Sequence, residues 1–143
     1  MRSQDLMKTA LVTVRPNARI QEVARRMRVH NVGFVPVCNE QGKVEGVVTD
    51  RDIACRVVAE GRSFDGPVSE CMSSEHIVTV RPNDDVARVQ QEMGSHRVSR
   101  VLVCDDHGVL KGVISLSDIA NAVDASQCAH TFQRVSAREV ESV

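Results

Sequence analysis

Aromatic residues are scarce in this sequence: its 143 residues include no Trp, no Tyr and three Phe. Proteins that bind single-stranded nucleic acids stack the bases on aromatic side chains, so the scarcity argues against this class. An excess of charge of one sign is also lacking, since the formal net charge is −1. Such a chain has no overall attraction to a phosphate backbone or to anionic lipid. We therefore expect neither a nucleic acid nor a membrane as a partner.

Long hydrophobic segments and paired cysteines are lacking as well. No apolar run approaches the ~20 residues that span a bilayer, and the first residues do not contain the apolar core of a signal peptide. The five cysteines are odd in number and show no Cys-x-x-Cys spacing. This usage predicts free thiols in a reducing compartment. The sequence therefore predicts a cytoplasmic protein without disulfides.

Valine is abundant, with 26 copies that favour β-strands, and much of it lies in an internal repeat. The hexapeptide over 12–17 recurs unchanged over 78–83. At this offset of 66 residues, 21 of the 48 positions in 12–59 are identical to those in 78–125. The chain is thus two copies of one small structural unit. Because a unit of about 60 residues buries little surface alone, we expect the two copies to pack together.

Each copy predicts the order β-α-β-β-α. The first copy is expected to contain strands over 10–14, 33–38 and 44–48, a helix between the first two strands, and a helix over 50–59. The corresponding segments of the second copy are strands over 76–80, 99–104 and 109–114 and a helix over 116–125. Asn17 in the first copy, and Asp84 or Asp85 in the second, are expected to cap the first helix. Pro67 is expected to start a short helix between the copies.

The predicted fold class is α/β (α+β), with two β-α-β-β-α repeats packed by their sheets about a pseudo-twofold axis. We expect a first domain over 1–62 and a second over 63–126. Residues 127–143 lie outside the repeat and are expected to form a polar C-terminal tail with one amphipathic turn.

A hydroxyl and an aspartate recur at the junction between the last strand and the last helix of each copy. These are Thr49 and Asp52 in the first copy, and Ser115 and Asp118 in the second. A capping box, which closes the start of a helix, is the interpretation that the residues alone favour. The alternative is a binding site, where the helix amides and the hydroxyl contact an anionic oxygen and the carboxylate accepts hydrogen bonds from the vicinal hydroxyls of a ribose.

Residues 5–125 resemble a tandem pair of CBS domains, the Bateman module. The features that carry the resemblance are the doubled element order, the strand Val35-Pro36-Val37, and the endings over 46–53 and 112–119. Stand-alone bacterial two-CBS proteins and the γ subunit of AMP-activated kinase are similar. The resemblance implies a regulatory module without enzymatic activity or a required cofactor, which binds AMP, ADP, ATP or S-adenosylmethionine in clefts between the repeats. It also implies a homodimer, with a further protein partner left open.

Each implied cleft takes its hydroxyl and aspartate from one repeat and its early segments from the other. The resemblance implies a better site formed by Thr49, Asp52, Val48, Ser74, Val78, Val98, Ser99, Arg100 and Leu102. It implies a second site formed by Ser115, Asp118, Ile114, Thr9, Val12, Val32, Gly33 and Pro36. In these roles the aspartates hold ribose hydroxyls, the aliphatic side chains enclose adenine, and Arg100 supplies charge for a phosphate. The second site has Gly33 and Phe34 where the better site has Ser99 and Arg100, so it lacks a hydroxyl and a cation.

Two other classes of function stay open. One is a protein-interaction module with vestigial clefts, and the other is a metal- or redox-responsive stress protein. His30 with Cys38, and His96 with Cys104, are zinc-ligand types, but they lack a short chelating spacing, so we predict no metal site. The sequence also shows no nucleophile with a neighbouring base and no Walker-type loop, and hence no catalytic residues.

Overall fold

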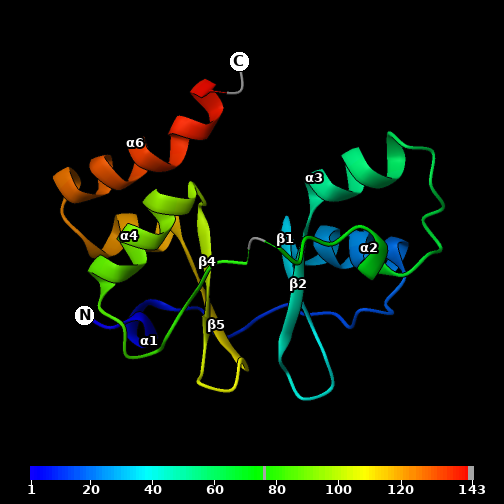
Figure 1. Ribbon diagram of the computed structural model, residues 1–143, viewed down its shortest axis with the longest axis horizontal. Coiled ribbons are helices and arrows are strands. Elements are labelled where there is room, and N and C mark those ends of the chain that lie inside the picture. Colours follow the sequence, from blue (N-terminus) through cyan, green and yellow to red (C-terminus); the bar gives the residue numbers. More distant parts are fainter. Residues whose placement is uncertain (76, 142–143) are drawn as a thin grey trace. The chain divides into compact units, whose positions relative to one another are not determined.

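The computed structural model describes residues 1–75 and 77–141 and contains helices and two small sheets, as the α+β prediction requires (Figure 1). The chain divides into two compact units. Unit 1 contains Met1–Leu11 and the chain from Val78 onward, and unit 2 contains Val12–Ile77. The sequence repeat places a boundary near residue 62, whereas the compact units group the first eleven residues with the second repeat.

Unit 2 is built on an antiparallel hairpin of β1 (Phe34–Cys38) and β2 (Val44–Thr49), with Val35 opposite Val48. Its helical segments are α2 (Ile20–His30), α3 (Asp50–Asp52), the π-helix η1 (Ile53–Val58) and the 3-10 helix η2 (Val68–Glu70). The strand predicted over 10–14 is reduced to one parallel bridge between Val14 and Val37. In the second repeat the N–H of Leu102 donates to the carbonyl of Val78 at 3.0 Å, but Pro36 stands at the position of Leu102 and has no backbone N–H, so this ladder does not extend back to Val12. The short helix expected after Pro67 is confirmed as η2.

The start of α2 differs from the prediction, because Asn17 does not cap it. The residue before the helix is Arg19, whose side chain makes no capping hydrogen bond. The backbone N–H groups of Ile20 and Gln21 donate instead to the carbonyls of Gly66 and Phe64, at 3.0 and 2.9 Å. The first backbone N–H groups of this helix, which have no partner within the helix, are therefore hydrogen-bonded by a distant segment rather than by a local side chain.

Unit 1 has a three-stranded sheet in the order β3-β4-β5, where β3 (Thr79–Val80) is parallel and β5 (Leu110–Ser115) antiparallel to β4 (Arg100–Cys104). Its helices are α1 (Ser3–Leu6), α4 (Val86–His96), α5 (Leu116–Ala122) and α6 (Ala125–Glu141). The Asp85 carboxylate accepts a hydrogen bond from the N–H of Ala87, so the predicted cap of α4 is confirmed. The strand predicted over 76–80 is shorter than expected, and residue 76 lies outside the described residues.

The C-terminal segment is a helix rather than a polar tail with one turn. Helix α6 lies alongside α4 in Figure 1 and contributes Val135 to the core of unit 1. The Gln90 side chain on α4 donates to the hydroxyl of Thr131, which is buried, at 3.0 Å. Cys128, Phe132 and Val135 recur at helical spacing along α6, so the sequence contained a signal for this helix although the segment lies outside the repeat. Packing against α4 supplies the stability that the local sequence lacks.

Candidate functional site

Both hydroxyl–aspartate motifs form complete capping boxes. In unit 2, the Thr49 hydroxyl accepts from the N–H of Asp52 at 3.1 Å, and Oδ2 of Asp52 accepts from the N–H of Thr49 at 2.9 Å. In unit 1, the N–H of Ser115 donates to Oδ2 of Asp118 at 2.8 Å, and the N–H of Asp118 donates to the Ser115 hydroxyl at 3.3 Å. The capping interpretation is therefore confirmed in both repeats.

Capping leaves the second oxygen of each carboxylate available for another partner. The Asp52 and Asp118 side chains are 14% and 13% exposed, and Oδ1 of each takes no part in its capping box. Oδ1 of Asp52 lies 3.6 Å from Nε of Arg56, and Oδ1 of Asp118 lies 3.5 Å from Nζ of Lys8. An ionised carboxylate has about four lone-pair sites, so one group can close a helix and still accept ligand hydroxyls. The two interpretations of the motif are compatible.

In each unit the segment that precedes the first strand region of a repeat lies beside the motif. Lys8 exchanges two backbone hydrogen bonds with Val113 on β5, at 3.0 and 3.1 Å. Ser73 makes the same pair of hydrogen bonds with Val47 on β2, at 2.9 and 2.8 Å. Thr9 and Ser74, which follow directly, are thus held near the strands that end in Ser115 and Thr49.

Glycine permits this close approach in both units. A Cβ at Gly112 would lie 2.7 Å from Cβ of Met7, and a Cβ at Gly46 would lie 2.9 Å from the backbone oxygen of Ser73. Both distances are too short for the atoms involved, and neither Met7 Cβ nor the Ser73 oxygen can move away by rotation of a side chain. Glycine inside a strand often marks such a point, where another part of the backbone comes near.

The predicted site residues divide between the units. Of the better site, unit 2 contains Thr49, Asp52, Val48 and Ser74, and unit 1 contains Val78, Val98, Ser99, Arg100 and Leu102. Of the second site, unit 1 contains Ser115, Asp118, Ile114 and Thr9, and unit 2 contains Val12, Val32, Gly33 and Pro36. Within unit 2, Gly33 accepts from the N–H of Asp50 at 3.0 Å; within unit 1, Ser99 accepts from the N–H of Leu116 at 2.8 Å. These bonds join the start of a hairpin to the start of the motif helix.

Three of the predicted aliphatic site residues are buried: Val48, Ile114 and Leu102, which is 1% exposed. Val48 and Ile114 are fully buried within the hydrophobic clusters of their own units. Val47 and Val113, which precede them, are half-buried and point to the opposite face because side chains alternate along a strand.

Sequence reasoning missed Arg56 and did not single out Lys8. Arg56 follows Asp52 by four residues, a spacing that places two side chains on the same side of a helix, so its contact was readable from the sequence. Lys8 approaches Asp118 only because it forms a β-bridge with Val113, and no short spacing in the sequence indicates this contact.

The cysteines lie in contrasting environments. Cys38, Cys71 and Cys104 are buried, Cys128 is half-buried and Cys55 is exposed on η1. Burial raises the pKa of the Cys38 and Cys71 thiols. Within residues 1–75 and 77–141, no group of three or more His, Cys, Asp or Glu side chains is placed to hold a metal ion.

The rate of alkylation should therefore distinguish the exposed thiol of Cys55 from the buried thiols of Cys38 and Cys71. The thiolate is the reactive form, so a buried thiol with a raised pKa reacts slowly. In native protein at pH 8, we expect iodoacetamide to modify Cys55 at least about tenfold faster than Cys38 or Cys71, as followed by peptide mass spectrometry. In urea the three rates should converge. Native labelling of Cys71 as fast as that of Cys55 would contradict this prediction.

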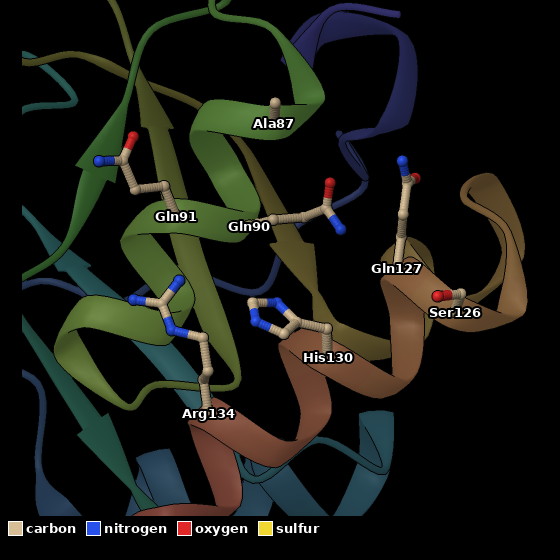
Figure 2. Close-up of a pocket in the computed structure, with 7 residues that line it drawn as sticks. All are labelled: Ala87, Gln90, Gln91, Ser126, Gln127, His130 and Arg134. Carbon is tan, nitrogen blue, oxygen red and sulfur yellow. The ribbon is translucent and has the colours of Figure 1, made fainter.

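A pocket of about 430 Å³ lies between α4 and α6, as Figure 2 shows. Six of its seven lining residues are of polar or charged types; the lining consists of Ala87, Gln90, Gln91, Ser126, Gln127, His130 and Arg134. The volume is in the range of small-molecule sites, but such sites are lined mostly by apolar side chains. None of the residues of the two predicted sites belongs to it. Separately, none of the helices over the described residues is both long enough and apolar enough to cross a membrane.

Comparison with known proteins matches the CBS domain family model over residues 3–58 and 68–125. The CBS domain-containing protein YhcV of Bacillus subtilis is 44% identical over 117 residues, which are 82% of this chain and 81% of that protein. The CBS domain protein PAE2072 from Pyrobaculum aerophilum, solved in complex with AMP, has a TM-score of 0.77 and 27% identity, covering 93% of this chain and 99% of that one.

The CBS domain pair of MJ0100, solved with 5′-methylthioadenosine and S-adenosyl-L-methionine, has a TM-score of 0.74 and 26% identity. The match covers 85% of this chain and 94% of that one. The two family matches fall on the two copies of the internal repeat, and both copies carry the capping-box motif. This chain therefore belongs to the CBS domain family and contains two CBS domains in tandem.

Proposed function

We propose that this protein is a regulatory module that binds an adenosine-containing ligand of the AMP, ADP, ATP or S-adenosylmethionine type. The observation that carries the proposal is the pair of largely buried carboxylates, Asp52 and Asp118, each with one oxygen outside its capping box. That the structures of PAE2072 and MJ0100 hold adenosine-containing ligands supports the same class of ligand.

In the proposed mechanism, each ligand lies between the two repeats. The carboxylate accepts the ribose hydroxyls, and the hydroxyl of Thr49 or Ser115 faces the ribose or the phosphate. The site of Thr49 and Asp52 is the better one, because the opposite repeat offers it the Ser99 hydroxyl and the exposed Arg100 guanidinium. Arginine binds phosphate well because its planar group donates two parallel hydrogen bonds.

Regulation would follow from a shift of population. A ligand that contacts both repeats favours the relative orientation in which it binds best, and a partner protein or a second copy of the chain responds to that orientation. We propose no catalytic step. We also propose that the protein is a cytoplasmic homodimer and that neither nucleic acid nor a membrane is its partner.

Isothermal titration calorimetry of the untagged full chain tests this proposal. We expect binding of AMP, ATP or S-adenosylmethionine, with GTP as the control. A ligand at a hundred times its dissociation constant should also add ~2.7 kcal/mol to the free energy of unfolding. Absence of binding and of any thermal shift with all three ligands would overturn the proposal and favour an interaction module with vestigial clefts.

A further inference from the structure

A positively charged side chain lies beside Oδ1 of each motif carboxylate, which is the oxygen that takes no part in the capping box. In unit 2 it is Arg56, 3.6 Å from Oδ1 of Asp52, and in unit 1 it is Lys8, 3.5 Å from Oδ1 of Asp118. The carboxylates are mostly buried, whereas Arg56 is 51% and Lys8 70% exposed. Since Oδ2 of each carboxylate is used by the capping box, a ligand hydroxyl must approach the oxygen that the cation faces.

The two cations are not copies of one inherited residue. Arg56 belongs to η1, and the residue 66 positions later is Ala122. Lys8 belongs to the segment before the repeat, and its structural counterpart is Ser73, because Lys8 and Ser73 form equivalent bridges to Val113 and Val47. Duplication of one ancestral unit would have left the same residue at the same position. Each unit instead supplies a positive charge to its carboxylate from a different element, which indicates a shared requirement for that charge.

We propose that Arg56 and Lys8 are specificity residues that select phosphorylated ligands over uncharged nucleosides. This inference rests on the proposed function. When the ribose hydroxyls take Oδ1 of the aspartate, the cation moves from that oxygen to the phosphate of the same nucleotide. Both side chains are long and at least half exposed, and Arg56 would also release its hydrogen bond of 3.4 Å to the carbonyl of Met72. The exchange therefore needs no change in the capping box.

The charge balance explains the selectivity. Each ion pair is long, at 3.5 or 3.6 Å, and its cation is at least half exposed to water, so breaking the pair costs little. A nucleoside breaks the pair and leaves the cation with water alone, whereas a nucleotide replaces the pair with a contact to a phosphate, which carries more negative charge. Charge-assisted hydrogen bonds to phosphate are the stronger kind, and arginine can form two at once. Arg56 should therefore discriminate more strongly than Lys8.

The test measures AMP and adenosine binding to the full chain by calorimetry, for wild type, Arg56→Gln and Lys8→Gln. We expect Arg56→Gln to weaken AMP binding about fivefold to tenfold and to change adenosine binding by less than about twofold. Lys8→Gln should have a smaller effect, confined to the weaker site. Arg56→Lys, which keeps the charge, should restore part of the AMP affinity. Arg25→Gln, which removes an exposed arginine of α2 in the same unit, is the matched control and should change neither ligand.

The outcomes distinguish failure of the specificity role from failure of the proposed ligand-binding function. If wild-type protein binds AMP and adenosine but the ratio of their affinities is the same in Arg56→Gln, the inference is wrong and the proposed function stands. An equal loss of affinity for AMP and for adenosine would mean that Arg56 only positions Asp52, which also overturns the inference. If wild-type protein binds neither ligand nor any other adenosine compound, both the function and the inference fail. Melting temperatures without ligand, compared with Arg25→Gln, show whether each variant is folded.

Discussion

Asp52→Asn should weaken AMP binding by about tenfold to a hundredfold while the protein stays folded. A hydrogen bond to a charged group is worth about 1.5–3 kcal/mol, and each 1.4 kcal/mol is tenfold in affinity. The amide of asparagine offers one acceptor oxygen. The N–H of Thr49 requires that oxygen for the capping box, so the ribose hydroxyls lose their partner. Calorimetry with AMP measures the loss, and urea unfolding verifies that the helix start survives.

Two matched variants give this prediction its control. Asp118→Asn makes the same change in unit 1 and should reduce AMP affinity less, since the second site lacks the equivalents of Ser99 and Arg100. Asp52→Ala should lose AMP binding to the same degree as Asp52→Asn and also cost about 1 kcal/mol of stability, because it removes half of the capping box. A larger loss of affinity in Asp118→Asn than in Asp52→Asn would reverse our ranking of the two sites.

Met93→Ala should cost about 2–5 kcal/mol of the free energy of unfolding. Met93 lies on α4 and is fully buried in the cluster that includes Val89, Val101 and Val135. Truncation removes favourable apolar burial and leaves a cavity among neighbours that belong to a sheet and two helices. Domains are stable by only about 5–15 kcal/mol, so the change is a large share of the total. Urea denaturation followed by circular dichroism measures it.

The repeat provides the comparison for this variant. Met27 on α2 is the counterpart of Met93 in unit 2 and is 7% exposed. Because water already reaches part of its side chain, Met27→Ala should leave a smaller cavity and cost less than Met93→Ala. A cost below about 1 kcal/mol for Met93→Ala would show that α6 collapses into the space, and would contradict the tight packing of unit 1.

The hairpins and the motif helices could be predicted from the sequence because their determinants are local. Alternating valines set the strands, and a hydroxyl with an aspartate three residues later sets each capping box. The structure confirms both, as well as the cap of α4 by Asp85. Thr49 and Ser115 lie where a strand ends and a motif helix begins, whereas Pro36 and Leu102 lie in the middle of β1 and β4; that these residues form sites is our proposal.

The elements that were predicted wrongly are those stabilised by distant partners. Helix α2 begins where carbonyls of Gly66 and Phe64 accept its first amides, so Asn17 gave a misleading signal. Helix α6 lies outside the repeat and is held by its contacts with α4, including the hydrogen bond from Gln90 to Thr131. Nothing in the spacing of Gln90 or Thr131 indicates this pair.

The sequence by itself determined the duplication, which comparison of the chain with itself reveals, and also the two hairpins and the two capping-box carboxylates, because each hairpin and capping box depends on residues within a few positions of one another. Tertiary structure alone decided which cation the Asp118 carboxylate faces. Arg56 reaches Asp52 along one helix, but Lys8 is 110 residues away from Asp118 in the chain and reaches it only because backbone hydrogen bonds join Lys8 to Val113. A contact made through such a bridge depends on how the chain folds back on itself, and local residue patterns do not encode it.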